Sequence, residues 1–195
     1  MIGFARVTRA PQWSGKTKLT VKPILFVFAA VAALLAGCAT HAPDVSSYVD
    51  QMTGLRTDLM ENELDAPGQP REIVWLNASR VFRSQNESDL YLEATYMAMK
   101  DRGYLEIPPG KTLTVIADGK PMTFDGTGSA NMRKPFKKDF VRETALYPIS
   151  KMQLQKIANA RDVKVQIKGN NGLVEREFKP ENFERLRKFV SYYAV

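Results

Sequence analysis

Cysteine and histidine are almost absent from this chain of 195 residues, which has one of each, Cys38 and His41. Both precede the first stretch with periodic apolar residues, which begins near Ile73. A single cysteine excludes an intramolecular disulfide framework, and a folded part without either residue excludes Ser/His and Cys/His catalytic pairs and a zinc site of ordinary composition. We therefore expect no metal site and no bound cofactor in the folded part.

Long apolar runs are scarce too. The longest, residues 24–36, has thirteen uncharged apolar positions and follows a basic stretch that ends at Lys22. A helix needs about 20 residues to span the hydrocarbon core of a bilayer, so this run is short for a permanent anchor. Its length is typical of the apolar region of a signal peptide.

The apolar run ends at the tetrapeptide Leu35-Ala36-Gly37-Cys38. This tetrapeptide resembles the lipobox of bacterial lipoproteins, in which small residues precede a cysteine that becomes the modified first residue. The resemblance implies a signal peptide over residues 1–37, recognition of Leu35, Ala36 and Gly37 by the signal peptidase, and covalent diacylglycerol and N-acyl lipid on Cys38. Such an anchor would be strong, since each buried CH₂ contributes about 0.8 kcal/mol.

The residue after the cysteine bears on the location of the protein. In lipoproteins of enteric bacteria, an Asp directly after the lipidated Cys favours retention at the inner membrane, whereas this chain has Ala39. The resemblance therefore implies a protein that is lipid-anchored to the outer membrane and faces the periplasm. The alternative is that Cys38 ends an uncleaved signal anchor.

Acidic residues are absent before Cys38, and this asymmetry accounts for most of the formal net charge of +7. All 21 acidic residues follow Cys38, whereas five of the 28 basic residues precede it. The chain after Cys38 is thus nearly balanced in charge. The sequence does not predict a nucleic-acid-binding protein.

Residues 38–70 are polar and are interrupted by proline and glycine. No apolar period is sustained there, so we expect the lipidated cysteine to be followed by a flexible tether. Residues 71–195 have the length of a single globular domain, and a domain of this size can bury a core without disulfides.

Seven segments of the expected domain have the composition and alternation of β-strands. These segments are 72–82, 91–99, 112–117, 120–124, 139–147, 163–168 and 173–178. The dipeptides Asp118-Gly119 and Asn171-Gly172 lie between neighbouring segments and are typical of tight hairpin turns. The strand over 91–99 has an alternative: one face of a helix would also be lined by Tyr91, Ala94, Met97 and Ala98.

Two short helices are expected near the C-terminus. Ser150 and Gln153 have the spacing of a capping box, and Pro180 suits the first position of a second helix. The apolar side of the first helix would be Met152, Leu154, Ile157 and Ala158, and the buried stripe of the second would be Phe183, Leu186, Phe189, Val190 and Tyr193. Hairpins followed by helices predict an α+β domain with a mainly antiparallel sheet of about six to seven strands.

Carboxylates are the remaining candidates for catalysis. The acidic residues that cluster or lie near expected strands are Glu61, Glu63, Asp65, Glu93, Glu106 and Glu143. An acidic pair becomes catalytic through its separation and its surroundings, so a solvated acidic face is the alternative and no catalytic residue is assigned. Residues 126–129 resemble a fragment of a glycine-rich phosphate loop but lack the Lys-Ser/Thr that would follow.

A basic segment with interleaved aromatic residues is the best candidate for a binding surface. Its five cations are Arg133, Lys134, Lys137, Lys138 and Arg142, and Phe136 and Phe140 lie between them. Such a segment could contact an anionic surface, such as phospholipid headgroups or an anionic glycolipid. The alternative is a solvated loop that leads into a strand.

Three functions are compatible with these observations. The anchor and the lack of a catalytic constellation favour a non-enzymatic binding or structural protein of the bacterial envelope, with another envelope protein or an anionic glycolipid as its partner. The alternatives are a carboxylate-dependent hydrolase or transglycosylase of envelope glycans and an adaptor of a secretion or assembly machine. Segments 75–78 and 169–172 also resemble uncharacterised envelope lipoproteins of Gram-negative bacteria, a resemblance that implies no function.

Overall fold

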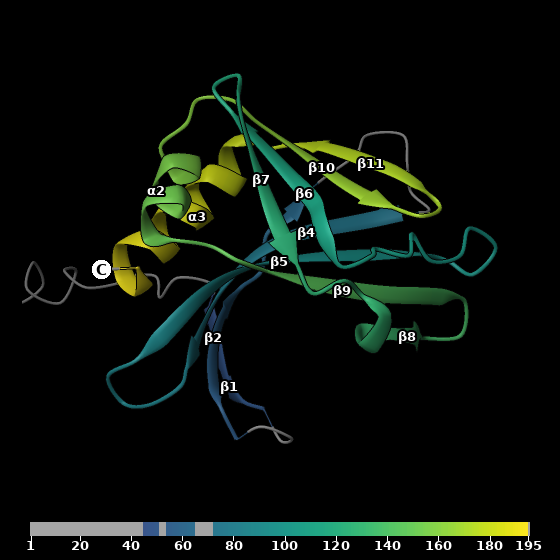
Figure 1. Ribbon diagram of the computed structural model, residues 1–195, viewed down its shortest axis with the longest axis horizontal. Coiled ribbons are helices and arrows are strands. Elements are labelled where there is room, and N and C mark those ends of the chain that lie inside the picture. Colours follow the sequence, from purple (N-terminus) through teal and green to yellow (C-terminus); the bar gives the residue numbers. More distant parts are fainter. Residues whose placement is uncertain (1–44, 51–53, 65–71, 195) are drawn as a thin grey trace, which may run out of the picture. The chain divides into compact units, whose positions relative to one another are not determined.

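The computed structural model describes residues 45–50, 54–64 and 72–194. Within these ranges, eleven strands form two antiparallel sheets, and two α-helices lie near the C-terminus (Figure 1). The predicted α+β class with a mainly antiparallel sheet is therefore confirmed. The number of strands exceeds the prediction because four short strands, β1 to β3 and β8, had no detectable period.

The larger sheet has seven strands in the described part of the chain. Six follow one another in the spatial order β1 (Val45–Val49), β2 (Arg56–Met60), β4 (Glu72–Phe82), β5 (Ser88–Met99), β9 (Phe140–Pro148) and β8 (Arg133–Phe136), and β3 (Glu63–Leu64) pairs with β4. The smaller sheet has the order β11 (Gly172–Glu177), β10 (Val163–Gly169), β6 (Gly110–Ala117) and β7 (Lys120–Gly126). A 3₁₀ turn, η1 (Ala130–Met132), precedes β8.

The hydrophobic core lies on the inner faces of the two sheets. Strands β4 and β5 alternate, so that Val74, Leu76, Leu92 and Ala94 are buried on one face. The side-chain hydrogen bond between Thr112 of β6 and Tyr147 of β9, 2.8 Å long, links the smaller sheet to the larger one.

Two helices complete the core. Helices α2 (Lys151–Ala158) and α3 (Pro180–Tyr193) pack on each other, with α2 against β6 and α3 against β2 and β4 (Figure 1). Of the helices in the described residues, none has the length and hydropathy that a membrane crossing requires.

The helix signals in the sequence are confirmed with one exception. Ser150 and Gln153 form the capping box, and α3 begins at Pro180. Met152, however, was wrongly placed on the apolar side of α2, because its side chain is 76 % exposed. It lies two positions before the buried Leu154, and two positions along a helix point to nearly opposite sides.

Both predicted hairpins are confirmed, but the turn between β10 and β11 is Asn170-Asn171 rather than Asn171-Gly172, since Gly172 pairs with Gly169 as the first residue of β11. Asp118 and Gly119 both have positive φ, 48° and 74°, as a tight primed turn between β6 and β7 requires. The ambiguous segment 91–99 is a strand, since β5 pairs with β4 on one side and β9 on the other.

The predicted tether over residues 38–70 is wrong for its described parts, 45–50 and 54–64, because β1, β2 and β3 lie in them. Met60 and Leu64 are each 1 % exposed in the core. The amide of Asn182 in α3 donates to Asn62 Oδ1 and to the Glu63 carbonyl oxygen, both at 2.8 Å. The folded part thus includes strands that precede the predicted domain of 71–195. The predicted signal peptide over 1–37, the lipobox-like tetrapeptide, Cys38 and His41 lie outside the described residues.

Candidate functional site

The larger sheet has a second face, turned away from the core, whose side chains are polar and yet buried. Strand alternation places Asn77, Ser79, Thr95 and Thr144 on this face. These four side chains are between 1 % and 7 % exposed, and Thr95 and Thr144 share a hydrogen bond of 2.9 Å. A solvated sheet face would expose such residues, so this face is covered by its own surroundings.

A hollow of about 530 Å³, which we name the trough, lies on this face. Its lining residues come from β1, β2, β5, η1, β8 and β9 and are Tyr48, Leu59, Glu93, Asn131, Met132, Arg133, Lys134, Arg142 and Thr144. Strands β1 and β8 are the two ends of the strand order in the described sheet. Because both line one hollow, the sheet must curve until its edges approach each other.

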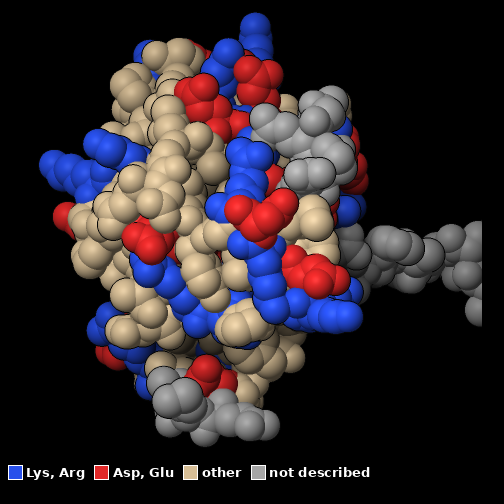
Figure 2. Space-filling model, turned by 90° about the vertical axis from the view of Figure 1, so that its right-hand side faces the viewer, with Lys and Arg blue, Asp and Glu red and all other residues tan. Residues whose placement is uncertain are grey.

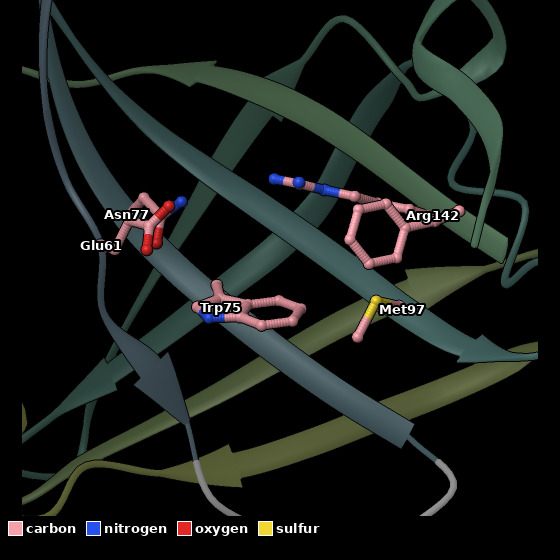
Figure 3. A pocket seen from close by; sticks show the side chains of 6 residues that line it. Glu61, Trp75, Asn77, Met97 and Arg142 are labelled. Carbon is pink, nitrogen blue, oxygen red and sulfur yellow. The ribbon is translucent and has the colours of Figure 1, made fainter. Parts of the chain in front are cut away.

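A smaller hollow of about 160 Å³, which we name the side pocket, shares Arg142 with the trough. It is lined by Glu61, Trp75, Asn77, Met97, Phe136 and Arg142. In Figure 3, the guanidinium of Arg142 is directed toward the side of the pocket formed by Asn77 and Glu61, while the Trp75 ring points toward Met97. Arg142 thus lines both hollows.

Arg142 is half-buried, and its charge is not neutralised by a direct contact. Its guanidinium lies 5.9 Å from the centre of the Phe136 ring. Within the described ranges, its side chain donates no hydrogen bond and forms no ion pair. Glu93 feels its charge from a greater distance. An arginine that keeps its donors free in a hollow is suited to bind an anionic group.

Glu93 is the carboxylate of the trough. Burial raises the pKa of Glu93, while the nearby Ser79 hydroxyl and the charge of Arg142 act in the opposite direction. Ser79 Oγ itself is buried and makes no hydrogen bond of ordinary geometry to the residues described. Across the trough, burial and the charge of Glu93 raise the pKa of Tyr48.

The structure separates the five cations of the predicted basic segment. Strands β8 and β9 form a hairpin in which Lys134 lies opposite Arg142, and both side chains belong to the trough face. Lys137 and Lys138 are exposed in the turn, where Lys137 has a φ of 54°. Contact of these exposed lysines with an anionic surface stays a prediction.

Arg133 has a different role, because it shares the opposite face of the hairpin with Glu143. Its Nε lies 3.5 Å from Glu143 Oε2 and donates to Ser129 Oγ at 3.2 Å. Although the Arg133 side chain reaches the trough lining, its charge is already paired. It therefore contributes less than Arg142 to any anion site.

No large area of one charge covers the side of the domain where the β8–β9 turn lies. Figure 2 shows Lys and Arg side chains intermixed there with Asp and Glu side chains. A uniformly basic contact surface would carry Lys and Arg side chains without intermixed Asp and Glu. Of the five cations, Arg133, Lys134 and Arg142 line the trough, whereas Lys137 and Lys138 lie in the exposed turn.

Glu143, one of the candidate carboxylates, holds a connecting segment in place. It is fully buried and accepts hydrogen bonds from the amide nitrogens of Leu105, Glu106 and Ile107 and from Ser129 Oγ. Segment 126–129, which resembled a phosphate loop, thus supplies a structural hydroxyl.

The other carboxylates are dispersed. Glu61 lines the side pocket and Glu93 the trough, whereas Glu106 approaches Arg133 and Asp65 lies outside the described residues. Nowhere in the described ranges do three Asp, Glu, His or Cys side chains gather in a way that could hold a metal ion.

Sequence reasoning missed most of the trough, including Tyr48 and Leu59, and it missed Trp75 of the side pocket. The sequence pattern that could have revealed this face lies in β4 and β5. Core residues alternate there with Trp75, Asn77, Glu93 and Met97. Such polar and aromatic residues on the second face of two adjacent central strands indicate a face that is neither core nor ordinary surface.

Comparison of the chain with protein-family models, with curated proteins and with solved structures finds no match.

Proposed function

We propose that this chain is a lipid-anchored protein of the bacterial envelope that binds a ligand in the trough without chemically changing it. The observation that carries the binding role is the half-buried Arg142 in the trough, whose guanidinium has no hydrogen bond or ion pair among the described residues. Buried polar groups normally have partners. Here a ligand would supply the partner for Arg142.

The anchor and the location belong to the same proposal. They rest on the lipobox-like tetrapeptide that ends at Cys38 and on Ala39 after it. The acyl groups on Cys38 would hold the domain at the outer membrane, facing the periplasm, and no other cofactor is proposed. The ligand would then be a periplasmic or membrane-derived molecule or part of an envelope component.

A binding role is favoured over glycan hydrolysis by the distribution of carboxylates. Most glycosidases need two carboxyl groups about 5 to 10 Å apart on either side of the scissile bond. Among the described residues, the trough is lined by one, Glu93, and the exposed Glu61 lines the separate side pocket. Glu143 is fully buried and is occupied by three backbone amides and a hydroxyl.

Photocrosslinking in intact bacteria tests the proposal. A photoreactive amino acid would replace Tyr48 or Leu59 in the trough, or the exposed Met152 or Leu173 elsewhere as matched controls. We expect adducts, detected as defined mass increases of the purified protein, from the two trough positions only. Adducts that form equally at Met152 and Leu173, or at no position, would contradict binding in the trough.

A further inference from the structure

We infer that the ligand of the trough is a small anion with two parts: an oxyanion group, phosphate or carboxylate, that binds at Arg142 and Lys134, and an apolar or aromatic group that enters the side pocket against Trp75, Met97 and Phe136. This inference rests on the proposed function and specifies its ligand class.

The anionic end follows from the charges that line the trough. Arg142 and Lys134 are directly opposite each other on β9 and β8 and share a face. Arg133, the third cation of the lining, is held by Glu143. A planar guanidinium can donate two parallel hydrogen bonds to a carboxylate or a phosphate, and a neighbouring ammonium adds an adaptable donor.

Glu93 is the charge that opposes an anion in the trough. Burial raises the pKa of this carboxyl, whereas the Ser79 hydroxyl and the charge of Arg142 act in the opposite direction. Arg142 and Lys134 together supply two positive charges against this single carboxyl. Glu61 is exposed at the side pocket and belongs to the apolar end of the site.

The apolar end follows from the composition and size of the side pocket. Trp75, Met97 and Phe136 supply two aromatic rings and a thioether, which suit a flat or aliphatic group. The pocket has a volume of about 160 Å³. A protein cavity of roughly 150 Å³ accommodates benzene, so one ring or a short chain fits.

The trough volume sets the overall size of the ligand. At about 530 Å³ it lies within the range of pockets for small molecules, roughly 300 to 1,000 Å³. A protein partner would instead need on the order of 800 Å² of contact surface on each side. We therefore infer a small molecule, or the end group of a larger one.

The test measures binding through the fluorescence of Trp75. The chain has two tryptophans, and Trp13 lies in the proposed signal peptide, so Trp75 is the single reporter of the processed protein. The processed, lipidated protein, in vesicles of neutral phosphatidylcholine, is titrated with phenyl phosphate and with phenylacetate. Two further probes are titrated in parallel: phenyl glucoside, which has the ring but no charge, and inorganic phosphate, which has the charge but no ring.

We expect a saturable change in Trp75 emission with at least one of the two aromatic anions, and the tighter anion identifies phosphate or carboxylate as the preferred group. Phenyl glucoside and inorganic phosphate should each bind at least about tenfold more weakly, since each lacks one of the two recognised parts. Equal binding of phenyl glucoside, or no saturable response to either anion, would overturn the inference.

Two variants locate the anion. Arg142→Gln should weaken binding of the preferred anion at least about tenfold, whereas Lys168→Gln, which removes an exposed cation from β10, should leave it unchanged. Unchanged binding by a folded Arg142→Gln variant would overturn the inference. If that variant does not melt cooperatively, the comparison of charged and neutral ligands on the parent chain decides.

The inference and the proposed function can fail separately. Adducts at Tyr48 and Leu59 together with a preference for the neutral ligand would retain binding in the trough and reject the anionic class. Failure of trough crosslinking rejects the proposed function itself.

Discussion

The guanidinium of Arg176 in β11 and the carboxylate of Glu72 in β4 form an ion pair of 2.5 Å that joins the two sheets, and both side chains are buried. Arg102 Nε lies 2.8 Å from the other carboxylate oxygen, and the Tyr96 hydroxyl donates to the same oxygen at 3.3 Å. Glu72 thus has a donor on each oxygen. Removal of a partner from such a buried carboxylate leaves a buried charge uncompensated and destabilises the folded state.

Arg176→Met should therefore lower the free energy of unfolding by about 3 kcal/mol, because it leaves Glu72 buried with Arg102 as its one remaining cation. The control is Lys164→Met, which breaks the exposed Lys164–Glu177 pair of 3.0 Å and should cost at most about 1 kcal/mol. Urea denaturation measures both values. Similar losses in the two variants would show that the Arg176–Glu72 pair does not stabilise the junction of the sheets.

Ionisation of the Tyr96 hydroxyl should lower the free energy of unfolding at high pH. Burial first, and then the charge of Glu72, raise the pKa of Tyr96 from 10.0 to about 12. Because this pKa is higher in the folded state, its contribution to stability is complete below about pH 10 and is lost as the pH rises from about 10 to 12. Tyr96→Phe should flatten the fall in unfolding free energy over this interval. An identical fall in both proteins would assign it to other groups.

Glu143→Gln tests the carboxylate that holds residues 105–107. An amide oxygen can replace one acceptor, but the amide nitrogen would face backbone donors, so we expect a loss of about 2 to 4 kcal/mol in unfolding free energy. Hydrogen exchange should also accelerate at the amides of Leu105 and Ile107. The partly exposed Glu106→Gln is the matched control, and faster exchange there as well would remove the special role of Glu143.

The start of the folded unit can be tested by truncation. A chain that begins at Ala42 keeps all the strands that bury Met60 and Leu64, whereas a chain that begins at Arg71 loses them. We expect the first to melt cooperatively and the second to aggregate or to melt at a lower temperature, since loss of a fully buried apolar side chain costs about 2 to 5 kcal/mol. Equal melting temperatures of the two chains would show that residues 45–64 do not stabilise the fold, as expected of a tether.

Lipidation is tested by Cys38→Ser. A hydroxyl cannot form the thioether to diacylglycerol, so the variant should accumulate as the uncleaved precursor and incorporate no labelled palmitate in growing cells. His41→Ser, three residues away, is the control that should be processed and labelled normally. Normal processing of Cys38→Ser would reject the lipobox interpretation.

The elements that the sequence predicts well are those with local causes. The Asp118-Gly119 turn and the Ser150 capping box depend on residues within four positions of each other. Short strands such as β1 and β3 have no such local signal, because their stability comes from pairing with β2 and β4. For this reason, a polar stretch with prolines was taken for a tether.

The site was harder to predict than the fold for a related reason. Arg133, Lys134 and Arg142 belong to one basic segment of the sequence. In the β8–β9 hairpin, strand alternation directs Arg133 to one face and Lys134 and Arg142 to the opposite face. Alternation is a local rule and could have separated them. The curvature that brings β1 and β8 to one hollow depends on the whole sheet, which no single segment encodes.

The pairing of Lys134 with Arg142 has a consequence for how the hairpin tolerates sequence change. Side chains alternate with a period of two, so deletion of one residue within β8 would exchange the two faces of the strand. The residue now bonded to Glu143 would enter the trough, and Lys134 would meet the buried carboxylate. The anchoring of residues 105–107 by Glu143 and the charge of the trough therefore both depend on the register of β8. A change in the length of β8 would alter both at once.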